Sequence, residues 1–152
     1  MAIHSTDLAA ILNALHPLLG SAPWRVRLGH GSFVTMDFGR KKSFSEDDKV
    51  RERGEYHLWI YLSAWRLDSI DEILAGSEDS REEIGPILEG LEGKELKHIR
   101  VNSPSLGLEF EFEDIVLRTF SIYSHDSEHW MLYTPSSKVL VAGPGASWRW
   151  DY

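Results

Sequence analysis

The 152-residue chain contains no cysteine. This absence excludes a disulfide framework, thiol-based catalysis and any zinc site that depends on cysteine ligands. The chain also lacks a run of roughly 18 apolar residues, which is the length that a membrane-spanning helix requires. Its first residues do not match a signal peptide, because they lack a basic start and because His4, Asp7 and Asn13 interrupt the apolar positions. We therefore expect a soluble, cytoplasmic protein.

Negative charge is unevenly distributed along the chain. The net charge is −8, and the segment 68–92 contains nine acidic residues but only one basic residue, Arg81. Outside this segment, acidic and basic residues are equal in number. A field of one sign repels nucleic acid and steers a basic partner toward the protein. The same pattern is also typical of a solvated helix face and loop that keep a protein soluble.

Hydrophobic periodicity predicts a single α+β domain over residues 1–152, with a predominantly antiparallel β-sheet. Leucine and isoleucine residues at helical spacing predict an N-terminal helix over residues 6–19, which Pro17 ends or kinks. An S-x-x-E capping pattern begins at Ser80 and predicts one short acidic mid-chain helix over residues 80–91.

Alternating apolar and polar residues predict about seven to eight strands. The turn at residues 29–32 joins the first two strands in a hairpin. Residues 39–54 are polar and mixed in charge, so we expect a loop there. The expected strands cover residues 24–28, 33–38, 55–67, 96–101, 106–112, 115–122, 129–133 and 139–141.

The strongest strand signal covers residues 55–67, where both faces are largely apolar or aromatic. One face carries His57, Trp59, Tyr61 and Trp65, and it ends near Arg66. Tryptophan, tyrosine and arginine are favoured at interfaces because they combine a large contact area with a polar group. This face is expected either to pack in the core under the N-terminal helix or to face a ligand or a partner.

No complete catalytic motif, phosphate-binding loop or metal-ligand set is present in the sequence. His125 and His129, with two carboxylates between them, are the best candidates for a metal site. The H-E-x-x-H pattern of zinc proteases is absent, so a polar turn is the alternative interpretation. No serine lies in a G-x-S-x-G elbow. The sequence therefore predicts no catalytic residue and no cofactor, and it favours a protein that is not an enzyme.

Five short strings carry a resemblance to known proteins. They are HLWIY at 57–61, AWR at 64–66, AGSEDS at 75–80, HWML at 129–132 and GPG at 143–145. With these strings, the chain resembles a group of small, uncharacterised bacterial proteins over residues 50–150. Some small acidic α+β proteins of this kind are immunity proteins of toxin systems. The resemblance implies a bacterial, non-enzymatic accessory protein and supplies no catalytic residues.

These features predict a protein-binding, immunity-type protein that recognises a basic partner through the segment 68–92 and the aromatic face. The residues expected to contact the partner are Glu78, Asp79, Glu82, Glu83, Trp59, Trp65 and Arg66. A first alternative is a small-ligand module or modest enzyme with a pocket lined by His57, Trp59, Tyr61 and Trp65. A second alternative is a structural subunit that forms homodimers through a strand edge with Trp148 and Trp150. Neither nucleic acid nor a membrane is expected as a partner.

Overall fold

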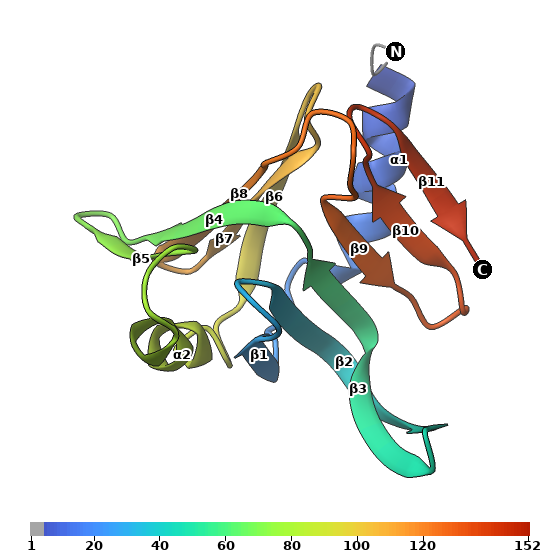
Figure 1. Ribbon diagram of the computed structural model, residues 1–152, viewed down its shortest axis with the longest axis horizontal. Coiled ribbons are helices and arrows are strands. Elements are labelled where there is room, and N and C mark those ends of the chain that lie inside the picture. Colours follow the sequence, from blue (N-terminus) through green and yellow to red (C-terminus); the bar gives the residue numbers. More distant parts are fainter. Residues whose placement is uncertain (1–4) are drawn as a thin grey trace.

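The computed structural model describes residues 5–152, which form two antiparallel β-sheets and two α-helices (Figure 1). The six-stranded sheet has the order β1-β2-β3-β9-β10-β11, and the five-stranded sheet has the order β5-β4-β8-β7-β6. The strands are β1 (Arg25–Leu28), β2 (Val34–Glu46), β3 (Lys49–Ile60), β4 (Ser63–Asp68), β5 (Ile73–Gly76), β6 (Leu96–Asn102), β7 (Gly107–Phe112), β8 (Ile115–Ser121), β9 (Trp130–Tyr133), β10 (Val139–Ala142) and β11 (Trp148–Asp151). The predicted α+β class and antiparallel pairing are confirmed. The predicted count of seven to eight strands is wrong, because the described residues form eleven.

The segment 55–67, predicted as one strand, is divided between the two sheets. β3 ends at Ile60 and β4 begins at Ser63, and Leu62 adopts a positive φ of 39° at the corner between them. The Ser63 hydroxyl fixes this corner by donating to the carbonyl oxygen of His129 at 2.9 Å. The two strands therefore do not share one continuous face, and the predicted alternation over the whole segment is corrected accordingly.

The polar segment 39–54, predicted as a loop, forms most of a hairpin arm between β2 and β3 (Figure 1). Its tight turn lies at Asp47 and Asp48, whose φ angles are 50° and 61°. Such positive angles are typical of the turns that match the twist of a β-hairpin, and aspartate tolerates them. The side chains of the arm are mostly exposed, because the arm extends beyond the core. Because both faces of the arm are polar, its sequence lacks the apolar alternation that would have predicted two strands.

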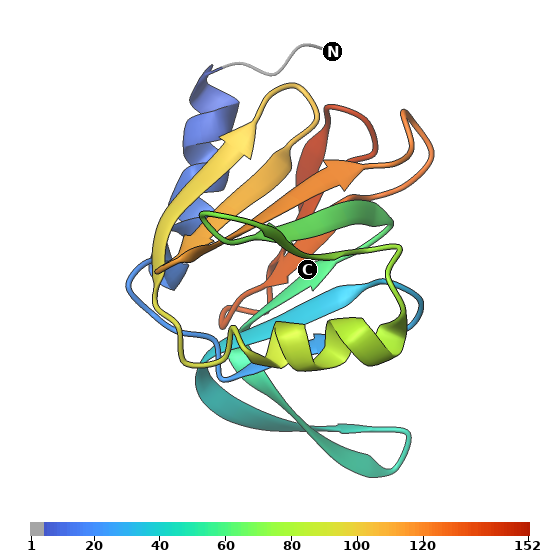
Figure 2. The same cartoon turned by 90° about the vertical axis from the view of Figure 1, so that its left-hand side faces the viewer.

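The hydrophobic core lies between the two sheets. Figure 2 shows the five-stranded sheet toward the viewer and the six-stranded sheet behind it. Alternate residues of β2, β3 and β9 point into this core and are fully buried, such as Met36, Leu58 and Leu132. The facing sheet contributes Phe110 and Leu117. Burial of each such side chain stabilises the fold by roughly 1.5–3 kcal/mol.

The N-terminal helix α1 (Ser5–Leu15) lies beside β6 and is followed by a 3₁₀ helix (His16–Leu18). Its buried residues include Ile11 and Leu15. The predicted helix over 6–19 is confirmed in position, and Pro17 lies where the α-helix gives way to 3₁₀ geometry. Neither α1 nor α2 has the length and apolar content that a membrane-spanning helix needs.

The acidic helix α2 (Arg81–Glu89) lies beside β1 and close to β5 (Figure 1). Ser80 is its N-cap, and its side chain accepts a hydrogen bond from the Glu83 backbone N–H at 3.3 Å. Ile84 and Leu88 bury one face of the helix. The predicted capping residue is therefore confirmed, because the capping pattern and the apolar spacing are local properties of the sequence.

Candidate interaction surface

Trp65 is a buried residue of β4 that connects two surface segments. Its indole Nε1 donates to the carbonyl oxygen of Ser32 at 2.7 Å, in the turn between β1 and β2. Its backbone carbonyl accepts from Ser77 N at 2.9 Å, and its backbone N–H donates to Ser77 Oγ at 3.2 Å. Ser77 begins the connection from β5 to α2. With 2% of its surface exposed, Trp65 positions both segments from inside rather than presenting a contact surface.

A second contact joins the same two regions. Arg81, the first residue of α2, donates from Nη1 to the carbonyl oxygen of Gly31. Gly31 and Ser32 are consecutive residues of the β1–β2 turn. The turn is therefore attached both to the core through Trp65 and to the acidic helix through Arg81.

Four partly or fully exposed rings form an aromatic cluster around this turn: His30, Phe33, Trp59 and Tyr61. The Phe33 ring centroid lies 4.7 Å from that of Tyr61 and 6.2 Å from that of Trp59. The rings of Trp59 and Tyr61 are 5.0 Å apart in an edge-on arrangement. Such geometry stabilises aromatic pairs beyond their buried area. Trp59 and Tyr61 were predicted from the sequence as members of one face, but Phe33 was not, because its contact with them depends on how β2 pairs with β3.

The predicted acidic contact residues lie where the β5–α2 connection enters the helix. We use the term acidic edge for Glu78, Glu82 and Glu83, which are exposed and whose carboxylates form no hydrogen bond or ion pair within residues 7–152. Asp79 is also exposed, but its Oδ2 accepts from Gly76 N at 2.8 Å and closes the connection. Carboxylates in the first turn also favour the helix because they complement its dipole.

Two other acidic residues of the segment 68–92 have structural partners. Glu92 accepts from the backbone N–H of Val26 in β1 at 2.9 Å. Asp68 forms ion pairs with Arg66 at 2.8 Å and with Arg118 at 2.7 Å. The hydrogen bond from Arg66, supported by the charge of Arg118, holds the pKa of Asp68 below its ordinary value. The charge available to a partner is therefore smaller than the net charge of the segment and lies mainly at its exposed carboxylates.

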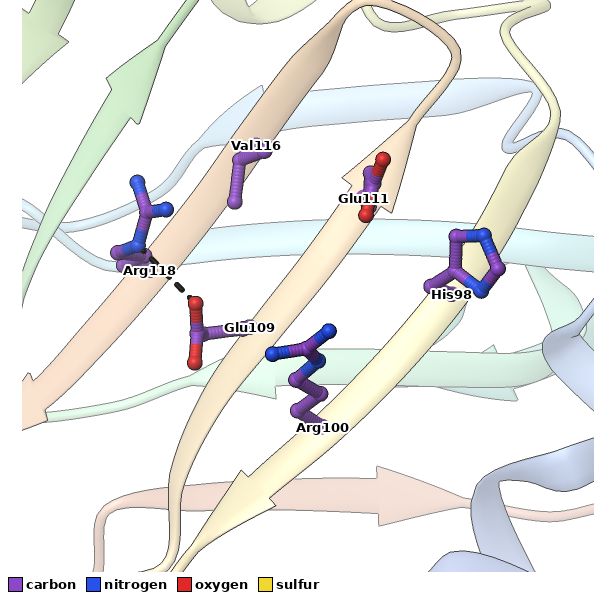
Figure 3. Close-up of a pocket in the computed structure, with 6 residues that line it drawn as sticks. All are labelled: His98, Arg100, Glu109, Glu111, Val116 and Arg118. Atoms are coloured by element: carbon purple, nitrogen blue, oxygen red, sulfur yellow. Dashed lines mark hydrogen bonds and ion pairs between the residues drawn. The ribbon is translucent and has the colours of Figure 1, made fainter.

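A shallow hollow of about 180 Å³ lies on the outer face of the five-stranded sheet (Figure 3). Its lining alternates in charge across three strands: His98, Arg100, Glu109, Glu111, Val116 and Arg118. Arg118 donates from Nε to Glu109 at 3.1 Å, as the dashed line in Figure 3 marks. This hollow was not predicted from the sequence, since Glu109 lies opposite Arg118 and Arg100 only through the strand register.

Arg66, predicted to contact a partner, belongs to the charge network beside this hollow. Its Nε and Nη2 atoms donate to the two carboxylate oxygens of Asp68 at 2.8 and 2.9 Å. Arg66 and Arg118 are register partners on adjacent strands, with Asp68 between their charges. Arg66 thus lies on the outer face of the five-stranded sheet, whereas Trp59 lies in the six-stranded sheet.

The predicted pocket residues are only partly brought together. His57 and Trp59 lie at alternate positions of β3, and Tyr61 directly follows the strand; all three are half-buried. Trp65, in contrast, is buried in the core. His57 Nδ1 lies 2.7 Å from Oδ1 of Asp37, a buried residue that the sequence analysis did not single out. Burial opposes ionisation of Asp37, but hydrogen bonds from His57 and Gly54 hold its pKa below the ordinary value.

The two histidines proposed for a metal site have different environments. His125 is exposed, whereas His129 is 3% exposed and its ring packs against Gly143, where an added Cβ would lie 2.8 Å from the ring. Burial lowers the pKa of His129, opposed in part by the Ser105 backbone and by Glu128. Over the described part of the chain, no three or more histidine, aspartate or glutamate side chains gather into a group that could hold a metal ion.

The structure therefore attaches the helix of the acidic edge to the turn beside the aromatic cluster, whereas the Arg66 side chain is paired with Asp68. The resemblance to small bacterial proteins stays a prediction, because no protein-family model, no curated protein and no solved structure matches the chain.

Proposed function

We propose that this protein is a non-enzymatic, immunity-type binding protein that recognises a basic protein through the acidic edge and the aromatic cluster. The observation that carries the proposal is the double attachment of the β1–β2 turn. Trp65 binds this turn at Ser32, and Arg81 binds it at Gly31. The turn beside the aromatic cluster is thus attached to the helix that carries Glu82 and Glu83, which supports a single surface with a fixed arrangement.

A fixed surface favours binding because less conformational freedom is lost when the partner docks. Interfaces commonly place aromatic side chains at their centre and polar groups at their rim. Here the half-buried rings of Phe33, Trp59 and Tyr61 provide the apolar part. Glu78, Glu82 and Glu83 provide a negative rim that attracts a basic partner over distances longer than contact. For a partner that is a nuclease, such a surface also competes with nucleic acid.

The test is affinity capture from a lysate of the source cell, with three forms of the protein as bait. The first is the wild type, and the second carries Glu78→Gln, Glu82→Gln and Glu83→Gln. Asp79 is left unchanged because its side chain closes the β5–α2 connection. The matched control removes three exposed charges elsewhere, by Asp48→Asn, Glu52→Gln and Asp126→Asn.

A basic protein captured by the wild type and the control, but lost by the acidic-edge variant, is the expected result. Equal capture by all three forms contradicts a role for the acidic edge. Equal loss from both variants means that net charge, rather than this surface, governs the association. A Trp59→Ala bait separates the aromatic contribution, and the expected loss of affinity is about 10-fold or more for a central aromatic contact.

A second candidate function is the binding of a small ligand on the outward face of β3. It is favoured by the Asp37–His57 pair, because the ionised Asp37 accepts from His57 Nδ1 and holds the ring, whose other nitrogen, Nε2, is left for a ligand. Trp59 lies two residues further along the same strand and serves as a fluorescent reporter. A metabolite that changes the fluorescence of the wild type, but not that of a His57→Ala variant, would support this function. An unchanged signal over a broad panel of metabolites would count against it.

A further inference from the structure

Each sheet has two edge strands, and three of these four edges have backbone groups bound by other parts of the chain. The contacts are Val26 N to Glu92 Oε2 in β1, Gly76 N to Asp79 Oδ2 at the end of β5, and Leu96 N to Ser21 O together with Gly20 N to Leu96 O in β6. Such contacts protect edges from pairing with another chain. β11 has no corresponding contact within residues 5–152.

β11 forms the outer border of the six-stranded sheet, opposite β1 (Figure 1). The hydrogen bond from Gly143 N to Ser147 O at 2.7 Å shows that these two residues form a hydrogen-bonded pair between β10 and β11. Hydrogen-bonded pairs recur at every second residue of an antiparallel pair, so the N–H and C=O groups of Arg149 and Asp151 point toward β10. Those of Trp148 and Trp150 point away from the sheet. The outer edge of β11 thus offers free donors and acceptors at alternate residues.

The sequence of β11 is complementary to itself when a second copy is placed antiparallel and centred on Trp150. Trp150 then lies opposite Trp150 of the second copy, and their outward backbone groups form a mutually hydrogen-bonded pair. Arg149 lies opposite Asp151 of the second copy, and by the two-fold symmetry Asp151 lies opposite Arg149 of the second copy. These two residues occupy the non-hydrogen-bonded positions, where side chains of opposing residues come closest.

The side chains agree with this register on both faces of the strand. Trp150 is 36% exposed and Tyr152 is 90% exposed, and both lie on the face opposite Arg149 and Asp151. In the centred register, Trp148 lies opposite Tyr152 of the second copy. Aromatic pairs therefore form on one face and ion pairs on the other.

Charged residues on a short edge strand commonly prevent pairing with foreign strands. In the isolated chain, Arg149 donates to Asp151 at 3.1 Å and to Glu128 at 3.4 Å. A foreign strand must disrupt these pairs without replacing them. A second copy of β11 replaces the Arg149–Asp151 pair with two equivalent pairs across the interface. The edge thus opposes general aggregation and accepts its own sequence.

We propose that this chain self-associates through antiparallel β11–β11 pairing around a two-fold axis at Trp150. The pairing joins two six-stranded sheets into one continuous sheet. Because β1 and β11 are the opposite edges of that sheet, the surface proposed for the basic partner stays free in both copies. Self-association through β11 does not depend on the proposed binding function.

The test uses two single charge reversals, Arg149→Asp and Asp151→Arg, in the full chain. Each variant places like charges opposite each other in its own homodimer, whereas a mixture of the two variants places opposite charges at every position. Mass is measured by sedimentation equilibrium up to about 1 mM protein, where even weak association is visible. Circular dichroism confirms that each variant is folded.

We expect the wild-type mass to rise with concentration from 17.4 kDa toward twice that value. Each single variant is expected to stay at the monomer mass, and their equimolar mixture is expected to associate again. A wild type that stays monomeric at every concentration overturns the proposal. A dimeric wild type whose variants associate singly, or fail to associate when mixed, overturns it as well, because the interface then lies elsewhere.

A second measurement needs no variant. Hydrogen exchange of the Trp150 amide should slow as the wild-type concentration increases, because the amide becomes hydrogen-bonded across the interface. The Val26 amide, which is already bonded to Glu92 at the opposite edge, should exchange at a constant rate. A Trp150 amide that exchanges equally fast at all concentrations contradicts the pairing.

Discussion

Asp37 of β2 and His57 of β3 lie 2.7 Å apart, Oδ1 to Nδ1, where the hairpin arm leaves the six-stranded sheet. The same Asp37 oxygen accepts from Gly54 N at 2.8 Å. The β2–β3 register shifts between Phe38 and Lys41, so the Gly54 N–H takes the Asp37 side chain as its partner. Asp37 therefore provides the hydrogen-bond partner of the Gly54 N–H, and its carboxylate also accepts from His57 Nδ1.

This relationship predicts how the stability of the protein depends on pH. Asp37→Asn should reduce the free energy of unfolding at pH 7 by about 1–3 kcal/mol, since a charge-assisted hydrogen bond inside the protein is weakened. The folded-state pKa of Asp37 lies, despite its burial, below the ordinary value of 3.8, because His57 and Gly54 donate hydrogen bonds to its carboxylate. Its contribution is therefore fully present above that value and is lost as the pH falls through the lower, folded-state pKa. The difference between wild type and variant should shrink in strong acid.

Urea unfolding of both proteins at pH 7 and near pH 2 measures this difference. Asp126→Asn is a suitable control, because Asp126 is exposed in the segment before β9. A wild-type advantage over Asp37→Asn that is equal at both pH values would rule out the ionised Asp37 as its source.

The base of the hairpin arm also requires a glycine. A Cβ added at Gly54 would lie 2.5 Å from the Phe38 carbonyl oxygen and 2.8 Å from the Phe38 nitrogen. Both atoms are backbone atoms, so they cannot move aside as the end of a side chain can. Gly54→Ala should therefore destabilise the protein by about 1–3 kcal/mol.

Gly76 of β5 provides the matched control for this substitution. A Cβ added there would lie 3.9 Å from the nearest atoms, Asp79 Oδ2 and the Trp65 carbonyl oxygen, which is ordinary van der Waals contact. Gly76→Ala should raise stability by roughly 0.5–1 kcal/mol, because alanine loses less backbone entropy on folding. Thermal unfolding of both variants tests the pair of predictions, and two changes of the same sign would contradict them.

Substitutions of two buried tryptophans can distinguish an effect on stability from an effect on the proposed binding. Trp65 donates from Nε1 to Ser32 O beside the candidate surface, and Trp130 donates from Nε1 to Leu106 O at 2.8 Å. Replacement of either residue by phenylalanine removes a donor and should cost about 1–3 kcal/mol, because a carbonyl oxygen loses its partner. Chemical unfolding measures both losses.

The two substitutions should differ in their effect on the β1–β2 turn. Trp65→Phe should accelerate hydrogen exchange in residues 29–33 and 77–80 and should weaken capture of a basic partner. Trp130→Phe should leave both properties close to wild type at a similar loss of stability. Equal effects of the two variants on capture would mean that Trp65 acts only through global stability.

Local sequence rules were sufficient for the helices but not for the strand that crosses the core. Ser80 caps α2 as its S-x-x-E pattern predicts, because the cap and its donor are three residues apart. The corner at Leu62 has no such local signal: apolar alternation continues through it, and the turn is fixed by contact of Ser63 with His129. Continuous alternation therefore predicted one strand where the chain passes between two sheets.

The exposed acidic residues of the candidate surface could be predicted from the sequence, but the contacts that attach them to the turn beside the aromatic cluster could not. The exposed carboxylates Glu78, Glu82 and Glu83 follow from the charge of their segment. The contacts that join them to the aromatic cluster, Trp65 with Ser32 and Arg81 with Gly31, link residues 33 and 50 positions apart. Such separations depend on the sheet order, which strand patterns alone do not specify. The charge network around Asp68 and Arg118, also 50 positions apart, was missed for the same reason.

The most direct test of the binding account is the association rate of the captured partner as a function of salt. Stopped-flow measurements should compare the wild type with the Glu78→Gln, Glu82→Gln, Glu83→Gln variant between about 50 mM and about 500 mM salt, a range over which screening increases strongly. The account predicts a wild-type rate that falls by about 10-fold or more and a clearly flatter dependence for the variant. The same salt dependence for both proteins would contradict it, because the acidic edge would then have no part in attracting the partner.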